Sequence, residues 1–201
     1  MIKCNVTLIG TISRDGEIKN DREGKEFIAF GVSTVVKASQ GINKTIDISV
    51  AMDASNHSRL EFLHGERIQL TGTLTFKKRD EFLYFNMSAD DAVHNPTQED
   101  GISGTISFRG TLGGKEITEK KGKKGSFTIF DGYSSEKVDE NQYAYTWVHF
   151  IDFSGKRPDW LNPKTAIDAE GELELSVYND RVNITCRTTS LSLWEKQNAN
   201  Q

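Results

Sequence analysis

The chain has 201 residues, enough for one large domain or two small ones, and its composition (36% hydrophobic, 27% charged, only 3 Pro) excludes collagen-like and low-complexity proteins. No apolar run approaches the ~20 residues of a membrane-spanning helix, and the first residues do not form a signal peptide, so we expect a cytoplasmic protein with no membrane partner. The net charge of -4 excludes a uniformly basic surface, but it leaves room for local basic clusters.

The first half of the chain has the pattern of five strands. Alternating apolar and polar residues predict strands around 5–8, 46–50, 68–70 and 83–87, and a further strand covers 25–35. Between the third and fourth strands, residues 54–65 carry a Ser or Asn that can cap a short helix and a Gly that can end it. This order is typical of the OB-fold, a small Greek-key barrel.

Residues 95–101 are polar with Pro and Gly, as in a linker, and the sequence beyond them repeats the first half at a period of about 100. Three segments return in order: 8–12 as 108–112, 27–30 as 127–130, and 68–74 as 167–173. We therefore predict an all-β chain of two tandem OB-fold five-stranded Greek-key barrels, at residues 1–94 and 102–194, followed by a short tail at 195–201. Residues 155–163 contain two Pro, so the short helix between strands three and four is expected only in the first barrel.

The recurring phenylalanines are expected in the barrel cores; they are Phe27, Phe30, Phe127 and Phe130. Catalytic motifs are missing: there is no phosphate-binding Gly-rich loop, Gly-x-Ser-x-Gly elbow or His-Glu-x-x-His helix, and the four histidines show no ligand spacing. Cys4 and Cys186 have the pattern of two buried apolar residues. We expect no enzymatic activity, no metal and no cofactor.

Basic residues gather in two clusters that the predicted strands place in loops. One lies between the fourth and fifth strands of the first copy, and the other between the first and second strands of the second copy. OB-folds bind oligonucleotides with these loops, so both clusters are candidate phosphate contacts, and solvated loop lysines are the alternative. The first cluster is Lys77, Lys78 and Arg79; the second is Lys120, Lys121, Lys123 and Lys124.

An aromatic ladder occupies the third strand of the second copy. Alternation over 143–151 places four side chains on the outer face, opposite a core face: Tyr143, Tyr145, Trp147 and His149. Exposed aromatic rings can stack bases without reading their identity, and the alternative is a face that packs against a partner subunit. The first copy has a poorer platform in Phe82 and Tyr84, because its third strand shows Asp47 and Ser49 outward.

Three motifs follow one another in the first copy: Asn-Val-x-Leu-Ile-Gly-x-Ile at 5–12, Arg-Asp at 14–15, and Phe-Leu-x-Gly-x-x-Ile-x-Leu-x-Gly-x-Leu at 62–74. Their order resembles the bacterial single-stranded DNA-binding protein family. That family places a base-stacking Trp in the third strand, so the resemblance implies that a base stacks on Trp147 in the second copy. It also implies that Ile46 or Ile48 stands at the equivalent position of the first copy, and that the chain forms a homodimer with four OB-folds. The family's acidic tip ending in Pro-Phe has no match in 193–201, so recruitment of other enzymes is not expected.

These features predict a non-enzymatic, largely sequence-independent binder of single-stranded DNA that acts by base stacking and phosphate contacts, in replication, repair, recombination or a mobile element. The alternative is an OB-fold protein-interaction module that has lost nucleic-acid binding, with Tyr143, Tyr145 and Trp147 as its interface. RNA in place of DNA stays open, because contact with the 2′-hydroxyl depends on placement that no motif here reveals.

Overall fold

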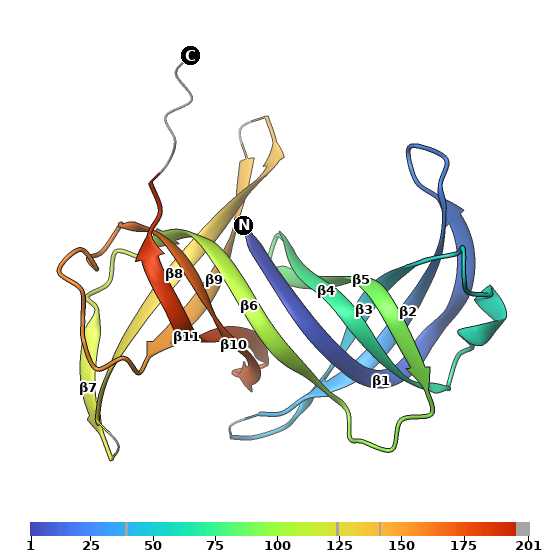
Figure 1. Cartoon of the computed structure of the whole chain (residues 1–201), viewed down its shortest axis with the longest axis horizontal. Helices are drawn as coiled ribbons and strands as arrows, with labels where there is room; N and C mark the ends of the chain where they lie inside the picture. Colours follow the sequence, from blue (N-terminus) through green and yellow to red (C-terminus); the bar gives the residue numbers. More distant parts are fainter. Residues whose placement is uncertain (39, 124, 141, 196–201) are drawn as a thin grey trace. The chain divides into compact units, whose positions relative to one another are not determined.

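The computed structural model describes residues 1–38, 40–123, 125–140 and 142–195, and strands dominate it (Figure 1). A membrane-spanning helix is absent from these residues, whose only helical segment is the three-residue turn η1. The elements in chain order are β1 (Ile2–Asn20), β2 (Glu26–Val36), β3 (Lys44–Asp53), η1 (Arg59–Glu61), β4 (Arg67–Arg79), β5 (Phe82–His94), β6 (Gly101–Leu112), β7 (Thr118–Gly122), β8 (Gly125–Asp139), β9 (Gln142–Asp152), β10 (Ala166–Tyr178) and β11 (Arg181–Leu193).

Strands β1 to β5 form the first barrel. β1 pairs with β2, β2 with β3, β5 with β4 and β4 with β1, all antiparallel, whereas β3 pairs with β5 in parallel. The parallel pair arises because residues 54–66 carry the chain from the end of β3 to β4, which leaves β5 to run alongside β3. This closed ring has the strand order of the OB-fold, so the predicted fold class is confirmed.

Strands β6 to β11 form a second barrel of the same kind. β8 pairs with β6 and β9, β10 pairs with β6 and β11, and β9 pairs with β11 in parallel. The counterpart of the long β1 is broken at residues 113–117 into β6 and β7, and both pieces pair with β8. The strand register repeats as well: Ile12↔Val32 returns as Leu112↔Gly132, Leu8↔Leu70 as Phe108↔Ala169, and Val50↔Met87 as Phe150↔Cys186. The repeat seen in the sequence is therefore a repeat of strand pairing.

A glycine is needed where the first strand of each barrel crosses the second. A Cβ atom on Gly10 would lie 2.3 Å from the carbonyl oxygen of Ser33, and one on Gly110 would lie 2.3 Å from that of Tyr133. No side chain fits at such a distance. This close approach explains why both copies of the repeated segment keep a glycine at the same place.

Stacked phenylalanines fill both barrels. The rings of Phe30 and Phe62 are 4.4 Å apart in the first barrel, and those of Phe130 and Phe150 are 5.0 Å apart in the second. All four side chains are at most 4% exposed. Phe27 and Phe127, in contrast, are half-buried, so their predicted core role is wrong.

The predicted helix of the first barrel is reduced to the single turn η1. Ser58 caps it by accepting a hydrogen bond from the Leu60 amide, and the Glu61 carboxylate accepts one from the Ser58 amide at 2.7 Å. Phe62 follows at once and is fully buried against Phe30, so the chain turns inward before a longer helix can form. In the second barrel, the segment 153–165 has no helix and inserts the fully buried Leu161, as the prolines predicted.

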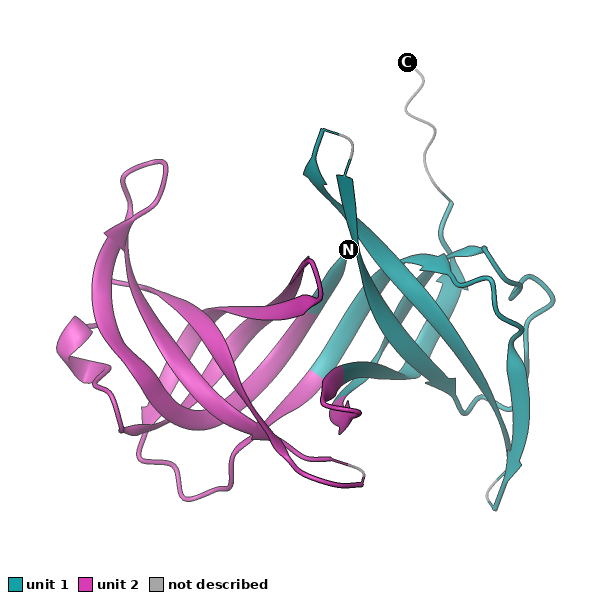
Figure 2. Ribbon diagram, turned by 180° about the vertical axis from the view of Figure 1, so that it is seen from behind, with its two compact units in different colours: residues 1–3, 105–174, 183–201 teal, residues 4–104, 175–182 magenta. Residues whose placement is uncertain are grey.

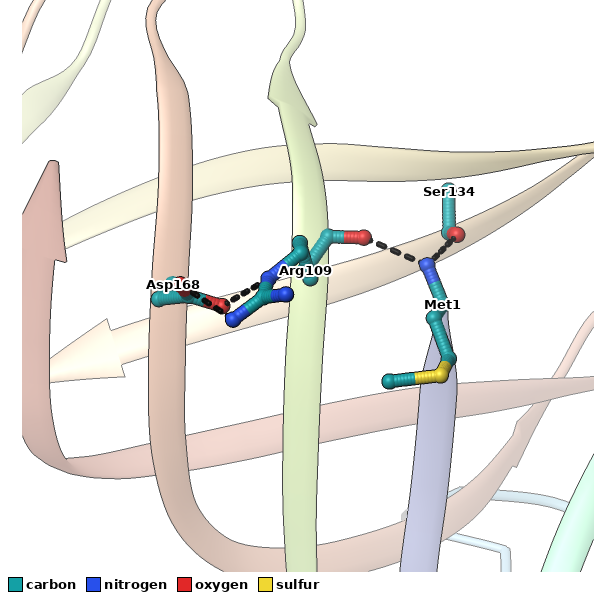
Figure 3. Close-up of polar contacts among 4 residues, drawn as sticks. All are labelled: Met1, Arg109, Ser134 and Asp168. Carbon is teal, nitrogen blue, oxygen red and sulfur yellow. Dashed lines mark hydrogen bonds and ion pairs between the residues drawn. The ribbon is translucent and has the colours of Figure 1, made fainter. Parts of the chain in front are cut away.

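Contacts divide the chain into two compact units (Figure 2). Unit 2 (residues 4–104 and 175–182) contains most of the first barrel, and unit 1 (residues 1–3, 105–174 and 183–201) contains most of the second. Within unit 1, the Met1 amine donates to the Arg109 carbonyl oxygen at 2.6 Å and to Ser134 Oγ (Figure 3). Arg109 also forms a bidentate pair with Asp168 at 2.7 and 2.9 Å, which ties β6 to β10.

Candidate nucleic-acid interface

Exposed aromatic side chains cover the outer face of the β8–β9 hairpin. Tyr143, Tyr145 and Trp147 are 54%, 46% and 51% exposed, whereas Val148 and Phe150 on the opposite face are at most 1% exposed. The alternation predicted from the sequence is present, because β9 is half-buried along this stretch.

Sequence reasoning missed a fourth ring on this face, Tyr133 of β8. Tyr133 is the cross-strand partner of Trp147, and its ring centroid lies 5.1 Å from that of Trp147 and 5.4 Å from that of Tyr145. The Tyr133 and Tyr145 rings meet nearly edge to face, at 80°. We call Tyr133, Tyr143, Tyr145 and Trp147 the aromatic face. Alternation along β8 was the signal that could have identified Tyr133, since Phe130 points inward.

Gly113 packs against one side of the Trp147 indole. A Cβ atom at Gly113 would lie 3.1 Å from Cζ3 and 3.4 Å from Cη2 of Trp147, and the Gly113 amide donates to the Asp131 carbonyl oxygen at 2.8 Å. The ring therefore rests on bare backbone on one side and contacts Tyr133 on another. Trp147 keeps one half of its surface open in a fixed orientation, which lowers the entropy lost when a ligand stacks on it.

His149 continues the aromatic face on β9, but it is engaged by a carboxylate. Its Nδ1 lies 2.7 Å from Oδ1 of Asp131, its cross-strand partner. The hydrogen bond from His149, helped by the charges of His149 and Lys115, lowers the pKa of Asp131 below its ordinary value. A negative charge therefore stands beside the aromatic face, on a carboxylate that is hydrogen-bonded to His149.

Phe153 extends the exposed aromatic residues beyond the end of β9, and it too was missed. It is 56% exposed, and its ring lies 5.5 Å from that of Phe127. Phe127 is the cross-strand partner of Lys120, and its ring covers Gly122, where a Cβ atom would lie 3.2 Å away. Phe127 thus lies on the outside of the barrel, which is why its predicted core role is wrong.

The second basic cluster lies mostly on a strand and not in a loop. Lys120 and Lys121 belong to β7, which pairs with β8, and Lys123 follows in the turn. Lys124 lies outside the described residues. Because opposite residues of an antiparallel ladder share a face, Lys120 lies next to Phe127 on the same face. The cluster is exposed, and none of its described lysines takes part in an ion pair between described residues.

The first basic cluster also ends a strand. Lys77, Lys78 and Arg79 close β4, and a two-residue turn leads to β5, with Asp80 in the left-handed region at φ 51°. The strand pairs Lys77 with Tyr84 and Arg79 with Phe82, so these four side chains share the outer face. We call them the hairpin block. Phe82 and Tyr84 are 69% and 50% exposed, and no ion pair between described residues involves Lys77, Lys78 or Arg79.

In the first barrel, Trp147 has an acidic counterpart. The pair Tyr133↔Trp147 corresponds to Ser33↔Asp47 in the repeated register, and Ser33 Oγ donates to Asp47 Oδ1. The expectation of Ile46 or Ile48 at this position is wrong, since both are buried in the core, at 6% and 1% exposure. Thr45 and Ser49 stand at the positions of Tyr145 and His149, so the first barrel has no aromatic face on β3.

No group of three or more His, Cys, Asp or Glu side chains in the described ranges could hold a metal ion. Both cysteines are fully buried, and burial raises the pKa of the Cys186 thiol to about 12. Neither thiol therefore belongs to the interface.

No family model matches the sequence, and no curated protein matches it. Among solved structures, the wild-type single-stranded DNA binding protein from Thermus aquaticus is similar at 13% identity and a TM-score of 0.48, over 100% of this chain and 96% of that one. The N-terminal domain of the PriB protein from Thermoanaerobacter tencongensis matches 46% of this chain and 97% of its own, at 20% identity and a TM-score of 0.31. Neither likeness is close enough to bear on what this chain binds.

Proposed function

We propose that this chain is a non-enzymatic, largely sequence-independent binder of single-stranded DNA. The observation that carries the proposal is the aromatic face of the second barrel, four rings on an outer strand surface, of which Tyr133 contacts both Tyr145 and Trp147. Large exposed apolar surfaces in folded proteins mark places of interaction. Stacking a base on an aromatic ring contributes about 1–3 kcal/mol per base without reading the base.

The spacing of the rings favours a single strand over a duplex. Tyr143, Tyr145 and Trp147 follow one another at every second residue, which on a strand is about 6.8 Å. Bases in one strand of a duplex are only about 3.4 Å apart. Neighbouring rings can therefore each hold one base only if those bases no longer stack on each other, which a paired duplex does not permit.

We assign phosphate contacts to the described lysines of the second basic cluster. Lys120, Lys121 and Lys123 are exposed, and Lys120 lies opposite Phe127, whose half-buried ring contacts the exposed ring of Phe153. A short basic segment next to stacking rings is the combination that non-specific single-strand binders use. The net charge of -4 limits phosphate attraction to such segments, so binding should weaken steeply with salt.

The remaining sequence predictions stand as parts of the same proposal. We propose one OB domain in each of the segments 1–94 and 102–194, a homodimer with four OB-folds, and a role in DNA replication, repair or recombination in the cytoplasm. The motif order of residues 5–74, which resembles the bacterial single-stranded DNA-binding proteins, supports them. Light scattering of the purified chain would test the dimer.

One binding assay distinguishes the candidate functions. Fluorescence anisotropy at low salt, with labelled single-stranded DNA, single-stranded RNA and duplex DNA of one sequence, should show the tightest binding for single-stranded DNA and the weakest for the duplex. Equal binding of RNA would overturn the choice of DNA. No binding of any of the three would favour the protein-interaction module, with the aromatic face as its interface.

A further inference from the structure

We infer that the two barrels contact a single strand through different elements: the second through its aromatic face, and the first through the hairpin block of Lys77, Arg79, Phe82 and Tyr84. The outer β2–β3 face of the first barrel, which is the counterpart of the aromatic face, does not bind the strand. This inference rests on the proposed function and goes beyond it, because two copies of one fold would be expected to bind in the same way.

The β2–β3 face of the first barrel carries carboxylates where the second barrel carries rings. Asp47 stands at the position of Trp147, and Asp53 at that of Phe153. Asp53 is paired with Lys25 at 2.5 Å, whereas the partner of Asp47 is the uncharged hydroxyl of Ser33. A carboxylate has no π-face for a base and repels phosphate, so this face disfavours a nucleic-acid strand.

The hairpin block carries the cations and exposed rings that the outer β2–β3 face of the first barrel lacks. The cross-strand pairs Lys77↔Tyr84 and Arg79↔Phe82 place two cations and two exposed rings together on the outer side of the hairpin. On the inner side, Phe76 meets Phe85 edge to face at 5.6 Å, and Phe85 is buried, so the hairpin is anchored to the barrel near the block. Cations next to stacking rings match a strand of phosphates and bases.

The second barrel repeats the hairpin block only in part. The repeat of β4 and β5 as β10 and β11 places Ser176 and Asn183 at the positions of Lys77 and Tyr84, and Tyr178 and Arg181 at those of Arg79 and Phe82. The second barrel therefore has one exposed ring on this hairpin, Tyr178, and its one cation at these positions is paired with Glu81 at 3.6 Å. Because the two sites belong to one chain, a strand that binds both should be held more tightly than a strand that binds either site alone.

Paired variants and two lengths of oligo-dT test the inference. A chain of about 8 nucleotides lies within the range covered by one OB-fold, and one of about 40 exceeds what two require. We expect Phe82→Ser with Tyr84→Ser to lower the affinity for the long oligonucleotide about tenfold or more, and to change that for the short one less than about twofold. Lys77→Gln with Arg79→Gln should change the two affinities in the same way, and should also reduce the salt dependence of binding to the long oligonucleotide. All four side chains lie on the outer face, and thermal melts would verify that the variants fold.

A matched pair of variants tests whether the outer β2–β3 face of the first barrel is free of the bound strand. Ser49→Glu and His149→Glu add a carboxylate at equivalent positions of the two barrels. We expect about a tenfold loss of affinity for His149→Glu and less than about a twofold loss for Ser49→Glu. Equal losses, or hairpin variants that bind the long oligonucleotide like the wild type, would overturn the inference while leaving the proposed function intact. A wild-type chain that binds neither oligonucleotide would instead refute the proposed function.

Discussion

Replacing Trp147 with alanine should weaken single-strand binding far more than it weakens the fold. The indole presents about half of its surface to solvent, at 51% exposure, and the covered half contacts Gly113 and Tyr133. Loss of one stacked base costs about 1–3 kcal/mol. Since about 1.4 kcal/mol corresponds to a tenfold change in Kd, Trp147→Ala should raise Kd roughly 5- to 150-fold.

The cost in stability should be smaller than for a core residue. Truncating a fully buried Trp destabilises a protein by about 3–5 kcal/mol, so we expect about 1–2 kcal/mol for this half-exposed side chain. Anisotropy titrations of labelled oligo-dT at one fixed salt concentration would measure Kd, and thermal melts would confirm folding. Trp147→Phe is the control, because it keeps a ring and should bind with intermediate affinity. A folded Trp147→Ala protein with Kd within about twofold of the wild type would refute the stacking role.

Three further predictions concern the support of the aromatic face, the salt dependence and the thiols. Gly113→Val should displace the indole of Trp147 and lower oligo-dT affinity severalfold with little loss of thermal stability; unchanged affinity would show that the indole needs no support there. Changing the three described lysines of the second basic cluster to Gln should reduce the log–log salt slope by about 0.7 for each phosphate that the variant no longer neutralises, whereas an unchanged slope would exclude these lysines from phosphate binding. Cys4 and Cys186 should react with a thiol reagent at pH 8 only after denaturation, because both are fully buried and the pKa of Cys186 is raised to about 12; a fast-reacting thiol in the native protein would contradict this.

The fold was largely predictable because the chain repeats itself. Segments 8–12 and 108–112 share a glycine whose absent side chain lets two strands cross, and such a constraint leaves a visible mark in the sequence. The short helix was harder to predict. Its capping residue is present at Ser58, but the helix ends after one turn because Phe62 is buried in the core. Tertiary packing therefore sets the length of the helix, and the local sequence does not reveal it.

The site was predictable where a strand is half-buried and unpredictable where it is not. Alternation located Trp147 and its neighbours, because Val148 and Phe150 mark the inner face. Lys120 and Lys77 were placed in loops because the ends of their strands extend past the apolar core and carry no alternation. The counterpart of Trp147 in the first barrel was misjudged by one residue, although alternation already placed Asp47 outward. The strand register identifies Asp47, because it pairs Asp47 with Ser33 as it pairs Trp147 with Tyr133.

The central claim is that a base stacks directly on Trp147. A protein carrying Trp160→Phe and Trp194→Phe keeps Trp147 as its one tryptophan, so its fluorescence reports that ring alone. Titration with oligo-dT at low salt should quench this fluorescence to saturation, at the same concentrations at which anisotropy shows binding, and added salt should reverse it. Binding seen by anisotropy with no change in Trp147 fluorescence would contradict the claim.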